Sequence, residues 1–313
     1  MEHLQKRLWV INLIRMTYHK SVLLNECIDG LNINPSGIYV DVTFGGGGHS
    51  LEILKKLTTG KLFAFDRDSD VEVNIPKDKN FKLLKTNYKN IKRFLRLEGV
   101  KKVDGILADL GVSSHQFDVA ERGFSFRFDA ELDMRMNKNA DLDAKQILNN
   151  YSKEDLANVL FNYGELRNSR RISDKIIELR NEMEIKTTTQ LISCISDAVP
   201  EKNRNQFLSQ VFQALRIEVN DEIDSLKQMM LDGVEILKSE GRFVVLSYHS
   251  LEDRIVKNIF KKGNLSGEIE KDFYGNVLKD LKEINRKVVV ASDEEKKGNS
   301  RSRSAKLRVA EKI

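Results

Sequence analysis

The stretch DVTFGGGGHS, residues 41–50, decides how the rest of this chain is read. The apolar GIYVDV that leads into it is typical of a short buried strand, and the LEILKKL that follows is typical of a helix. Four consecutive glycines weaken regular structure and add nothing to a core, so the backbone must turn sharply here or approach a ligand closely. A strand, a glycine loop and a helix in this order predict a site for a nucleotide-like cofactor.

Strand and helix patterns alternate through the first third of the chain. The apolar runs KLFAFD, FKLLKT and VDGILADL each predict a buried strand, and NIKRFLRLEG predicts a helix between the last two. This alternation implies a parallel sheet with helical crossovers, so we expect a Rossmann-like α/β fold. GRFVVLSYHS predicts a fifth buried strand, and INRKVVVAS and SAKLRVAE are expected to pair as antiparallel strands near the end.

The alternation stops between residues 112 and 205, where the pattern is helical and polar. A helical pattern then runs from Leu208 to Leu237 and leads back into the α/β region. We therefore predict an α/β domain formed by residues 17–111 and 206–313, interrupted by an inserted helical domain at 112–205. Residues 1–16 are predicted to be a leader outside both domains, with Met16 favoured as the true first residue.

Composition limits the classes of protein to which the chain can belong. It has 313 residues, 40% apolar and 32% charged, as expected for a soluble, cytoplasmic α/β protein. There is no apolar run of about 18 residues, so no membrane span is expected. Cys27 and Cys194 lack metal-ligand spacing, so neither a metal site nor a disulfide framework is predicted. The net charge of +5 is compatible with a polyanionic partner.

The glycine loop fits one class of cofactor better than another. A dinucleotide loop, G-x-G-x-x-G, would need a third glycine where Ser50 or Leu51 stands. Read from Asp41, the loop is instead a variant of the D-x-G-x-G-x-G loop with which methyltransferases bind S-adenosylmethionine. Asp66 ends the next strand roughly 20 positions after the glycines, where such folds present an acid to ribose hydroxyls. Asp109 ends the fourth strand at the same edge of the sheet.

Longer strings then point to a family: YHKSVLLNE (18–26), DVTFGGGGHS (41–50), ADLGVSSHQFD (108–118) with ERGFSFRFDAELDMRM (121–136), FQALRIEVNDE (212–222), SYHSLEDRIVK (247–257) and NSRSRSAKLRVAEK (299–312). With these strings the chain resembles the bacterial small-subunit rRNA cytosine-N4 methyltransferases over nearly everything after Met16. The resemblance implies a class I methyltransferase fold and methyl transfer from S-adenosylmethionine to the N4 amine of a decoding-region cytidine. The implied partner is 16S rRNA or the small ribosomal subunit.

The resemblance also implies a cofactor site. His49 would donate to the cofactor carboxylate at a helix start, Asp66 would bind the ribose, and Tyr88 would lie against the adenine. Asp109 and Gln116 would close the pocket at the methionine end. The cofactor-binding residues implied in this way are Gly47, Gly48, His49, Asp66, Tyr88, Asp109 and Gln116.

The chain departs from the family pattern at the substrate side more than at the cofactor side. Gly46 stands where many relatives have arginine in G-R-G-G-H-S, and residues 129–136 read D-A-E-L-D-M-R-M where the family has D-G-P-L-D-M-R-M.

Asp109 is the first candidate to orient the cytosine amine or to accept its proton. His249, at the end of the fifth predicted strand, is the second candidate, although a structural role is favoured for it. Methylation of cytosine carbon 5 would need a cysteine nucleophile, and neither Cys27 nor Cys194 lies near the loop motifs in the sequence.

Two basic segments could contact RNA or form a solvated surface, and the sequence does not decide between these. They comprise Arg167, Arg170, Arg171, Lys175 and Arg180 in the insert, and Arg301, Arg303, Lys306 and Arg308 near the C-terminus. Phe124, Phe126 and Phe128 alternate as stacking aromatics or core residues would, and we expect at least two of them in the core.

Two other classes of function remain as alternatives. An NAD-linked oxidoreductase could use the same glycine loop, although the missing third glycine argues against it. A non-catalytic RNA-binding protein could keep the same fold, although the intact loop, Asp66 and Asp109 argue against that. The sequence also leaves a homo-oligomer open.

Overall fold

The computed structural model describes residues 21–285 and 287–313 and shows two compact units. Among the described residues, the first unit is formed by those up to Gly111 and from Ser225 onward, and the second by Val112–Asp224. The predicted start of the insert, residue 112, coincides with the start of the second unit. The predicted leader, residues 1–16, lies outside the described residues.

The second unit ends later than residue 205, the boundary predicted above. Helix α10, Arg204–Asn220, is packed into the core of the second unit, so the boundary moves to Asp224. The helical pattern is also broken at Asp221, which has a φ of 49°, and Leu237 begins a strand. The apolar spacing of α10 continues through the next helix, α11 (Glu222–Ile236), so the periodicity of the sequence alone could not reveal this break.

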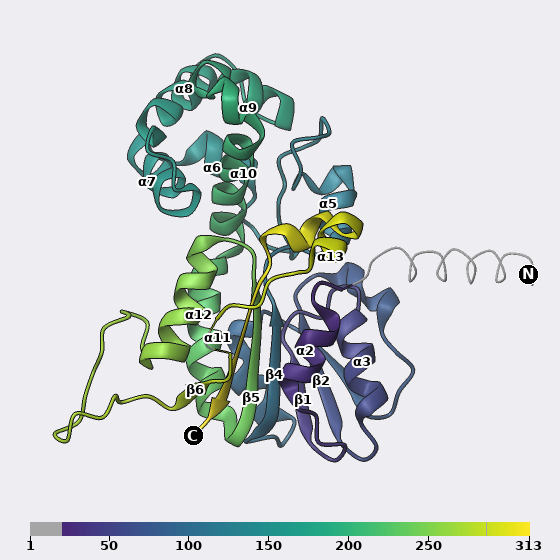
Figure 1. Cartoon of the computed structure of the whole chain (residues 1–313). Helices are drawn as coiled ribbons and strands as arrows, with labels where there is room; N and C mark the ends of the chain where they lie inside the picture. Colours follow the sequence, from purple (N-terminus) through teal and green to yellow (C-terminus); the bar gives the residue numbers. More distant parts are fainter. Residues whose placement is uncertain (1–20, 286) are drawn as a thin grey trace, which may run out of the picture. The chain divides into compact units, whose positions relative to one another are not determined.

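Seven strands form one sheet in the first unit, in the order β3-β2-β1-β4-β5-β7-β6 (Figure 1). The first five strands are parallel where they pair, and β7 is antiparallel to both of its neighbours. The predicted Rossmann-like, mainly parallel α/β fold is thus confirmed. The strands are β1 Ile38–Asp41, β2 Lys61–Asp66, β3 Phe81–Lys85, β4 Val103–Asp109, β5 Leu237–Ser247, β6 Leu281–Glu283 and β7 Lys306–Lys312.

The antiparallel pair at the end of the chain differs from the prediction. The main partner of β7 on this side is β6, which lies just before the predicted INRKVVVAS strand. Within that predicted strand, Val289 makes one isolated bridge to Leu307. The polar stretch that follows forms α13, Asp293–Gly298, and η6, Ser300–Ser304.

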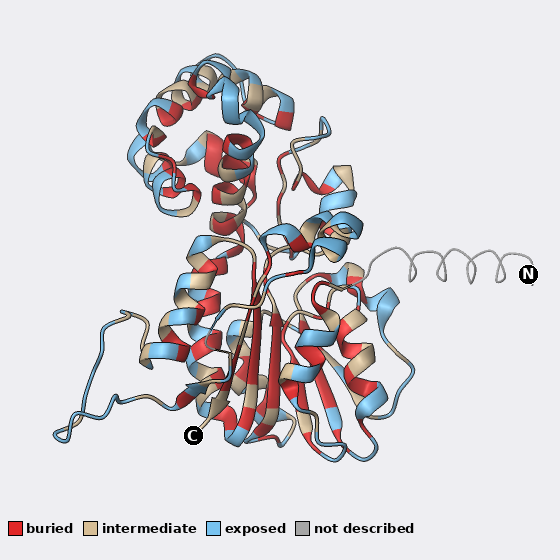
Figure 2. Ribbon diagram, viewed as in Figure 1, coloured by how far each residue is buried: buried red, intermediate tan, exposed pale blue. Residues whose placement is uncertain are grey.

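The sheet has an apolar core on each face. The other helices of this unit are α2 Leu24–Leu31, α3 Gly48–Lys56, α4 Ile91–Leu97, α11 Glu222–Ile236 (in this unit from Ser225 on) and α12 Ser250–Lys262. In β4, Ile106 and Ala108 belong to the core with α4, α11 and α12, whereas Leu107 belongs to the core with α2 and α3. Successive side chains of a strand point to opposite faces, so the central strands are buried along most of their length (Figure 2).

No helix within residues 21–285 or 287–313 is both long enough and apolar enough to cross a membrane.

The second unit is helical, and two of the family-like strings meet in its core. The amide of Asn220 accepts a hydrogen bond from the Met136 N–H at 2.8 Å and donates one to the Met134 carbonyl at 2.7 Å. Buried Arg122 donates to the Met136 carbonyl at 3.2 Å. These polar residues therefore fix a loop. The helices are α5 Ser114–Asp118, α6 Ala144–Asn150, α7 Lys153–Gly164, α8 Ser169–Glu182, α9 Thr188–Cys194 and α10.

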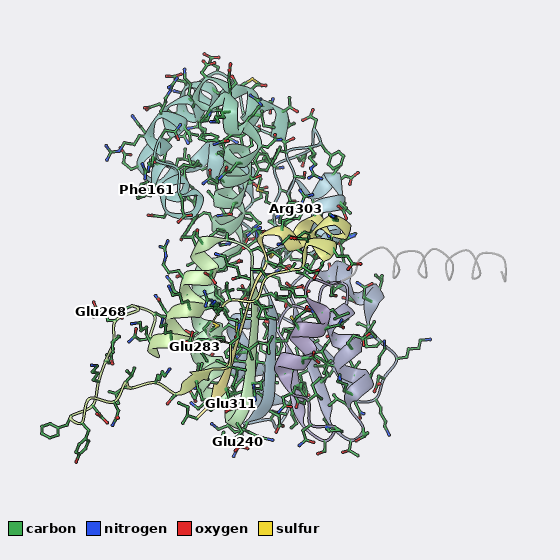
Figure 3. The ribbon with its side chains drawn as sticks, in the orientation of Figure 1. Phe161, Glu240, Glu268, Glu283, Arg303 and Glu311 are labelled. Carbon is green, nitrogen blue, oxygen red and sulfur yellow. The ribbon has the colours of Figure 1, made fainter. Side chains whose placement is uncertain are left out.

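Two cations of the C-terminal basic segment are used inside the first unit. Arg308 Nε and Nη2 lie 2.8 and 3.2 Å from the two carboxylate oxygens of Asp253, and both side chains are 14% exposed. Lys306 Nζ lies 3.5 Å from the same carboxylate. The structure thus gives these two candidates for RNA contact a role in holding β7 to α12. Arg303, labelled in Figure 3, is exposed.

Replacing Arg308 by alanine would leave the largely buried carboxylate of Asp253 without its bidentate partner. We expect Arg308→Ala to lower the free energy of unfolding by about 2–3 kcal/mol, measured by urea unfolding. Arg303→Ala removes the same charge from an exposed position and should leave the stability unchanged within error. Equal effects of the two substitutions would contradict a structural role for Arg308.

Candidate active site

The glycine loop joins the end of β1 to the start of α3. Gly45 and Gly47 have φ angles of 49° and 77°, in the left-handed region that side chains disfavour. A Cβ on Gly47 would also lie 3.1 Å from the ring of Phe44, whereas a Cβ on Gly46 would meet nothing within 4 Å. The backbone therefore requires glycine at positions 45 and 47, and position 46 has room for the arginine of the family pattern.

Asp41, at the end of β1, holds the loop in place. The side chain is buried, its Oδ1 accepts a hydrogen bond from the Thr43 N–H at 3.0 Å, and its Oδ2 accepts one from the Ser50 hydroxyl at 2.7 Å. Burial raises the pKa of Asp41, while these hydrogen bonds oppose that shift. One carboxylate oxygen is bonded to the loop and the other to α3, so Asp41 fixes the conformation of the loop and does not bind a ligand.

Asp66, at the end of β2, is also bonded to the loop. Its Oδ2 accepts a hydrogen bond from the Gly45 N–H at 2.8 Å, and its Oδ1 accepts one from the Asp68 N–H at 2.9 Å. Burial raises the pKa of Asp66 to about 6, although both N–H donors favour the ionised form. Each carboxylate oxygen has a second lone pair, so Asp66 can accept hydrogen bonds from two further hydroxyls.

Asp109, at the end of β4, is the third carboxylate of this edge. Its Oδ1 accepts a hydrogen bond from the Tyr248 hydroxyl at 2.6 Å, and its backbone N–H donates to Thr43 Oγ1 at 2.6 Å. Its side chain is 25% exposed, so it is not fully enclosed by the protein. Burial raises the pKa of Asp109, while His49 and the Tyr248 hydrogen bond lower it.

His49 is held between the N-terminal segment and Asp109. The side chain is 5% exposed, and its Nε2 lies 3.2 Å from the carbonyl oxygen of Val22. When Nε2–H donates to this carbonyl, Nδ1 faces Asp109 Oδ2 at 3.7 Å. Both ring nitrogens thus have protein neighbours, so the ring is poorly placed for the predicted bond to a cofactor carboxylate. The His49 backbone N–H lies in the first turn of α3, where N–H groups lack intrahelical partners.

His249 has the structural role that was favoured for it. It is the N-cap residue of α12, and its Nδ1 accepts a hydrogen bond from the Glu252 N–H at 3.5 Å. Its Nε2 lies 3.2 Å from Glu252 Oε1, but the angles do not make a hydrogen bond there or to any other atom of the described residues. The carboxylate of Glu252 in turn accepts hydrogen bonds from the His249 N–H at 3.4 Å and from the Tyr248 N–H at 2.8 Å. This capping box explains the histidine without a catalytic step.

The remaining predicted cofactor residues differ in their surroundings. Asp66 pairs in register with Lys85 of β3, so half-buried Tyr88 leaves the same edge of the sheet a few residues later. Gln116 lies in the second unit, where its Oε1 accepts a hydrogen bond from the Ser113 N–H at 3.0 Å. Gln116 thereby completes the capping box of α5, and its role at the methionine end of the cofactor stays a prediction.

Cys27 lies closer to the carboxylates than its place in the sequence indicated. Its thiol is fully buried in α2, and burial, followed by the charges of Asp109 and of other carboxylates nearby, raises its pKa well above the usual value. A cysteine nucleophile must be a thiolate, which such surroundings oppose. Cysteine-dependent methylation of carbon 5 is therefore disfavoured by protonation of Cys27, and not by its distance from the site.

Tyr248 is the site residue that the sequence analysis missed. It stands next to His249, which the sequence analysis chose for its place at the end of the fifth predicted strand. The sequence indicated that β4 and β5 end at the same edge of the sheet. The register that pairs Asp109 with Leu246, and so brings Tyr248 to Asp109, is found only in the structure.

The chain matches known proteins over almost its whole length. The model of the MraW methylase family matches residues 16–313. Proteins named ribosomal RNA small subunit methyltransferase H are 57% identical in Flavobacterium johnsoniae, over 95% of this chain and 99% of that protein, and 52% identical in Phocaeicola vulgatus, over 95% and 98%. The Cytophaga hutchinsonii protein of the same name is 52% identical, over 94% and 99%. The chain therefore belongs to the MraW methylase family and is a methyltransferase that uses S-adenosylmethionine.

Proposed function

We propose that this methyltransferase transfers a methyl group from S-adenosylmethionine to the N4 amine of a cytidine in the decoding region of 16S rRNA. The names of the bacterial relatives support small-subunit rRNA as the substrate. The observation that carries the proposal is that Asp66 and Asp109 are both bonded to the glycine loop, through Gly45 and Thr43. With rRNA as substrate, the enzyme works in the cytoplasm on 16S rRNA or the small ribosomal subunit.

The residues around the loop fit the cofactor. Asp66 would accept hydrogen bonds from the ribose hydroxyls, and Tyr88 would lie against the adenine. A Cβ on Gly47 would meet Phe44 at 3.1 Å and one on Gly48 would meet Ser21 Oγ at 2.1 Å, so internal packing already requires both glycines, and their contact with the cofactor stays a prediction. The His49 backbone N–H at the positive end of α3 would donate to the cofactor carboxylate. The role predicted for His49 is thus assigned to its backbone N–H and not to its ring.

The chemistry needs orientation and a proton acceptor. The N4 amine is a weak nucleophile because its lone pair is delocalised into the ring. S-adenosylmethionine held by these residues would supply an electrophilic methyl group to N4, with the neutral thioether as the leaving group. The amine then carries one proton too many, and we assign its acceptance to Asp109 Oδ2. The negative charge of Asp109 also stabilises the positive charge that builds on the amine.

Contact with RNA is assigned to a smaller set of residues than the sequence suggested. Arg180 donates to the carbonyls of Leu148 and Tyr151, so it holds helices of the second unit together. Arg167 and Arg170 are exposed at the start of α8. Among the alternating aromatics, Phe124 and Phe126 pack in the core, as expected for at least two of the three, and Phe128 is 46% exposed. Arg171 is exposed but donates to the Asp197 carbonyl at 3.0 Å. In the second unit, Arg167, Arg170 and Phe128 are therefore the first candidates, and exposed Arg303 remains a candidate in the first unit.

The raised pKa of Asp66 predicts pH-dependent binding of the cofactor. Ribose hydroxyls need the ionised carboxylate, so affinity is full above the pKa of about 6 and falls as the pH drops through it. Calorimetric titration should find S-adenosylmethionine binding about tenfold weaker at pH 5 than at pH 7. Asp66→Asn should bind weakly at both pH values. An unchanged pH dependence in this variant would remove Asp66 from the ribose site.

The exposed Arg167, just before α8, and Arg170, in its first turn, predict a measurable electrostatic share of RNA binding. Replacing Arg167 and Arg170 together by alanine should weaken binding of 16S rRNA and reduce its salt slope by about 2. Binding of S-adenosylmethionine should be unaffected. Lys175→Ala is the matched control on the same helix, because Lys175 already pairs with Glu178 at 3.0 Å. If the double variant keeps the wild-type salt dependence of rRNA binding, these two arginines are solvated surface residues that do not contact RNA.

The methyl-transfer step can be tested on Asp109. In single-turnover methylation of 16S rRNA at saturating cofactor, Asp109→Asn should be slower by about 10²–10⁴, with a smaller loss of cofactor affinity. Asp66→Asn is the control, because it should lose affinity and keep most of the saturated rate. Nucleoside mass mapping of the product should find N4-methylcytidine. A wild-type enzyme that leaves this cytidine unmodified would overturn the proposed function, and a full saturated rate in Asp109→Asn would make Asp109 a binding residue only.

A further inference from the structure

We propose that Tyr248 is a positioning residue for methyl transfer: its hydroxyl occupies Oδ1 of Asp109, so that Oδ2 is held ionised and presented to the cytosine amine. The proposal rests on the proposed function, because Asp109 matters to Tyr248 only if its carboxylate serves the reaction. It concerns a residue that lies outside the predicted site and that makes no direct contact with substrate in this scheme.

The geometry separates the two oxygens of Asp109. The Tyr248 hydroxyl donates to Oδ1 at 2.6 Å, within the usual range for a charge-assisted O–H···O⁻ hydrogen bond. The nearest cation-forming group to Oδ2 is His49 Nδ1 at 3.7 Å, beyond hydrogen-bond distance. Oδ1 already accepts the Tyr248 hydroxyl, and the side chain as a whole is 25% exposed, so we assign the acceptance of a substrate proton to Oδ2.

The backbone on both sides fixes this arrangement. Thr43 Oγ1 accepts the Asp109 N–H at 2.6 Å, and Asp109 pairs in register with Leu246 of β5. Tyr248 comes two residues after Leu246, and its own N–H is held by Glu252 at 2.8 Å. Gly111, with a φ of 88°, would place a Cβ 3.7 Å from the Tyr248 ring. Neither partner of the hydrogen bond is therefore free to drift away from the other.

The charges around Asp109 show what the hydroxyl contributes. His49 on α3 favours the carboxylate, whereas burial, Asp41 on β1 and Glu252 on α12 all oppose it. The buried thiol of Cys27 is a further neighbour of Asp109, and it is protonated. A phenol whose pKa is raised well above its usual value, as for Tyr248, stays a hydrogen-bond donor throughout the working range. Removal of this donor should raise the pKa of Asp109.

The test is the pH profile of single-turnover methylation at saturating S-adenosylmethionine. The base must be ionised, so a higher pKa of Asp109 moves the acid limb of the profile to higher pH. We expect a shift of about one to two pH units in Tyr248→Phe, with cofactor affinity nearly unchanged. Substitution of Tyr248 by 3-fluorotyrosine, a stronger donor, should shift the limb in the opposite direction.

Tyr39→Phe is the matched control. Tyr39 is a buried tyrosine of the same sheet whose hydroxyl accepts the Asn34 N–H at 2.7 Å, so this variant also loses one internal hydrogen bond. It should lose stability and keep the wild-type acid limb. Carbon-13 NMR titration of the Asp109 carboxylate in wild type and Tyr248→Phe provides a second measurement that does not require activity.

The outcomes separate the two proposals. If Tyr248→Phe changes neither the acid limb of the pH profile nor the NMR titration of Asp109, the role proposed for Tyr248 is wrong. This conclusion holds whether or not Asp109 is the base. The titration of Asp109 could instead shift in Tyr248→Phe while Asp109→Asn keeps the full saturated rate. That result would overturn the catalytic role of Asp109, and with it the positioning role of Tyr248. A shifted limb with a shifted titration is the result that the structure predicts.

Discussion

The structure depends on burying three carboxylates at one edge of a parallel sheet. Asp41, Asp66 and Asp109 end neighbouring strands, and for each of them burial raises the pKa. An ionised carboxylate withdrawn from water is tolerable only where hydrogen-bond donors replace the water. The glycine loop supplies such donors through the N–H groups of Thr43 and Gly45. The loop therefore stabilises the carboxylates of Asp41 and Asp66 even before a cofactor is considered, whereas that of Asp109 receives its donor from Tyr248.

Thr43 shows how one residue can connect this edge. Methyltransferase loops often have glycine at this position, whereas here the hydroxyl accepts the Asp109 N–H at 2.6 Å and lies 3.4 Å from Asp41 Oδ1. A hydroxyl can accept from one group and donate to another, which glycine cannot do. The ends of β1 and β4 are thereby tied together by a side chain. Glycine is kept instead at positions 45 and 47, where the backbone has positive φ angles.

The sequence predicted the parts of the site that depend on local pattern. Apolar runs located the five parallel strands, and in a parallel sheet this placed Asp66 and Asp109 at one edge without further information. It could not predict Tyr248, because the partner of Asp109 depends on register between strands that are far apart in the chain. It placed the end of the insert too early for a related reason: α10 and α11 continue one apolar spacing, and the break at Asp221 is a single backbone angle.

Net charge was the weakest guide to RNA binding, because many cations of this chain are used internally. Arg308 pairs with Asp253, Arg216 pairs with Glu222 at 2.8 Å, and Arg180 donates to backbone carbonyls. A guanidinium that satisfies a buried acceptor cannot move to a phosphate without leaving that acceptor unpaired, which costs more than a phosphate contact at the surface returns. RNA affinity must therefore come from exposed cations such as Arg167 and Arg170, whose contacts replace only water and counterions. A count of exposed cations on each unit is thus a better estimate of RNA binding than the overall charge of +5.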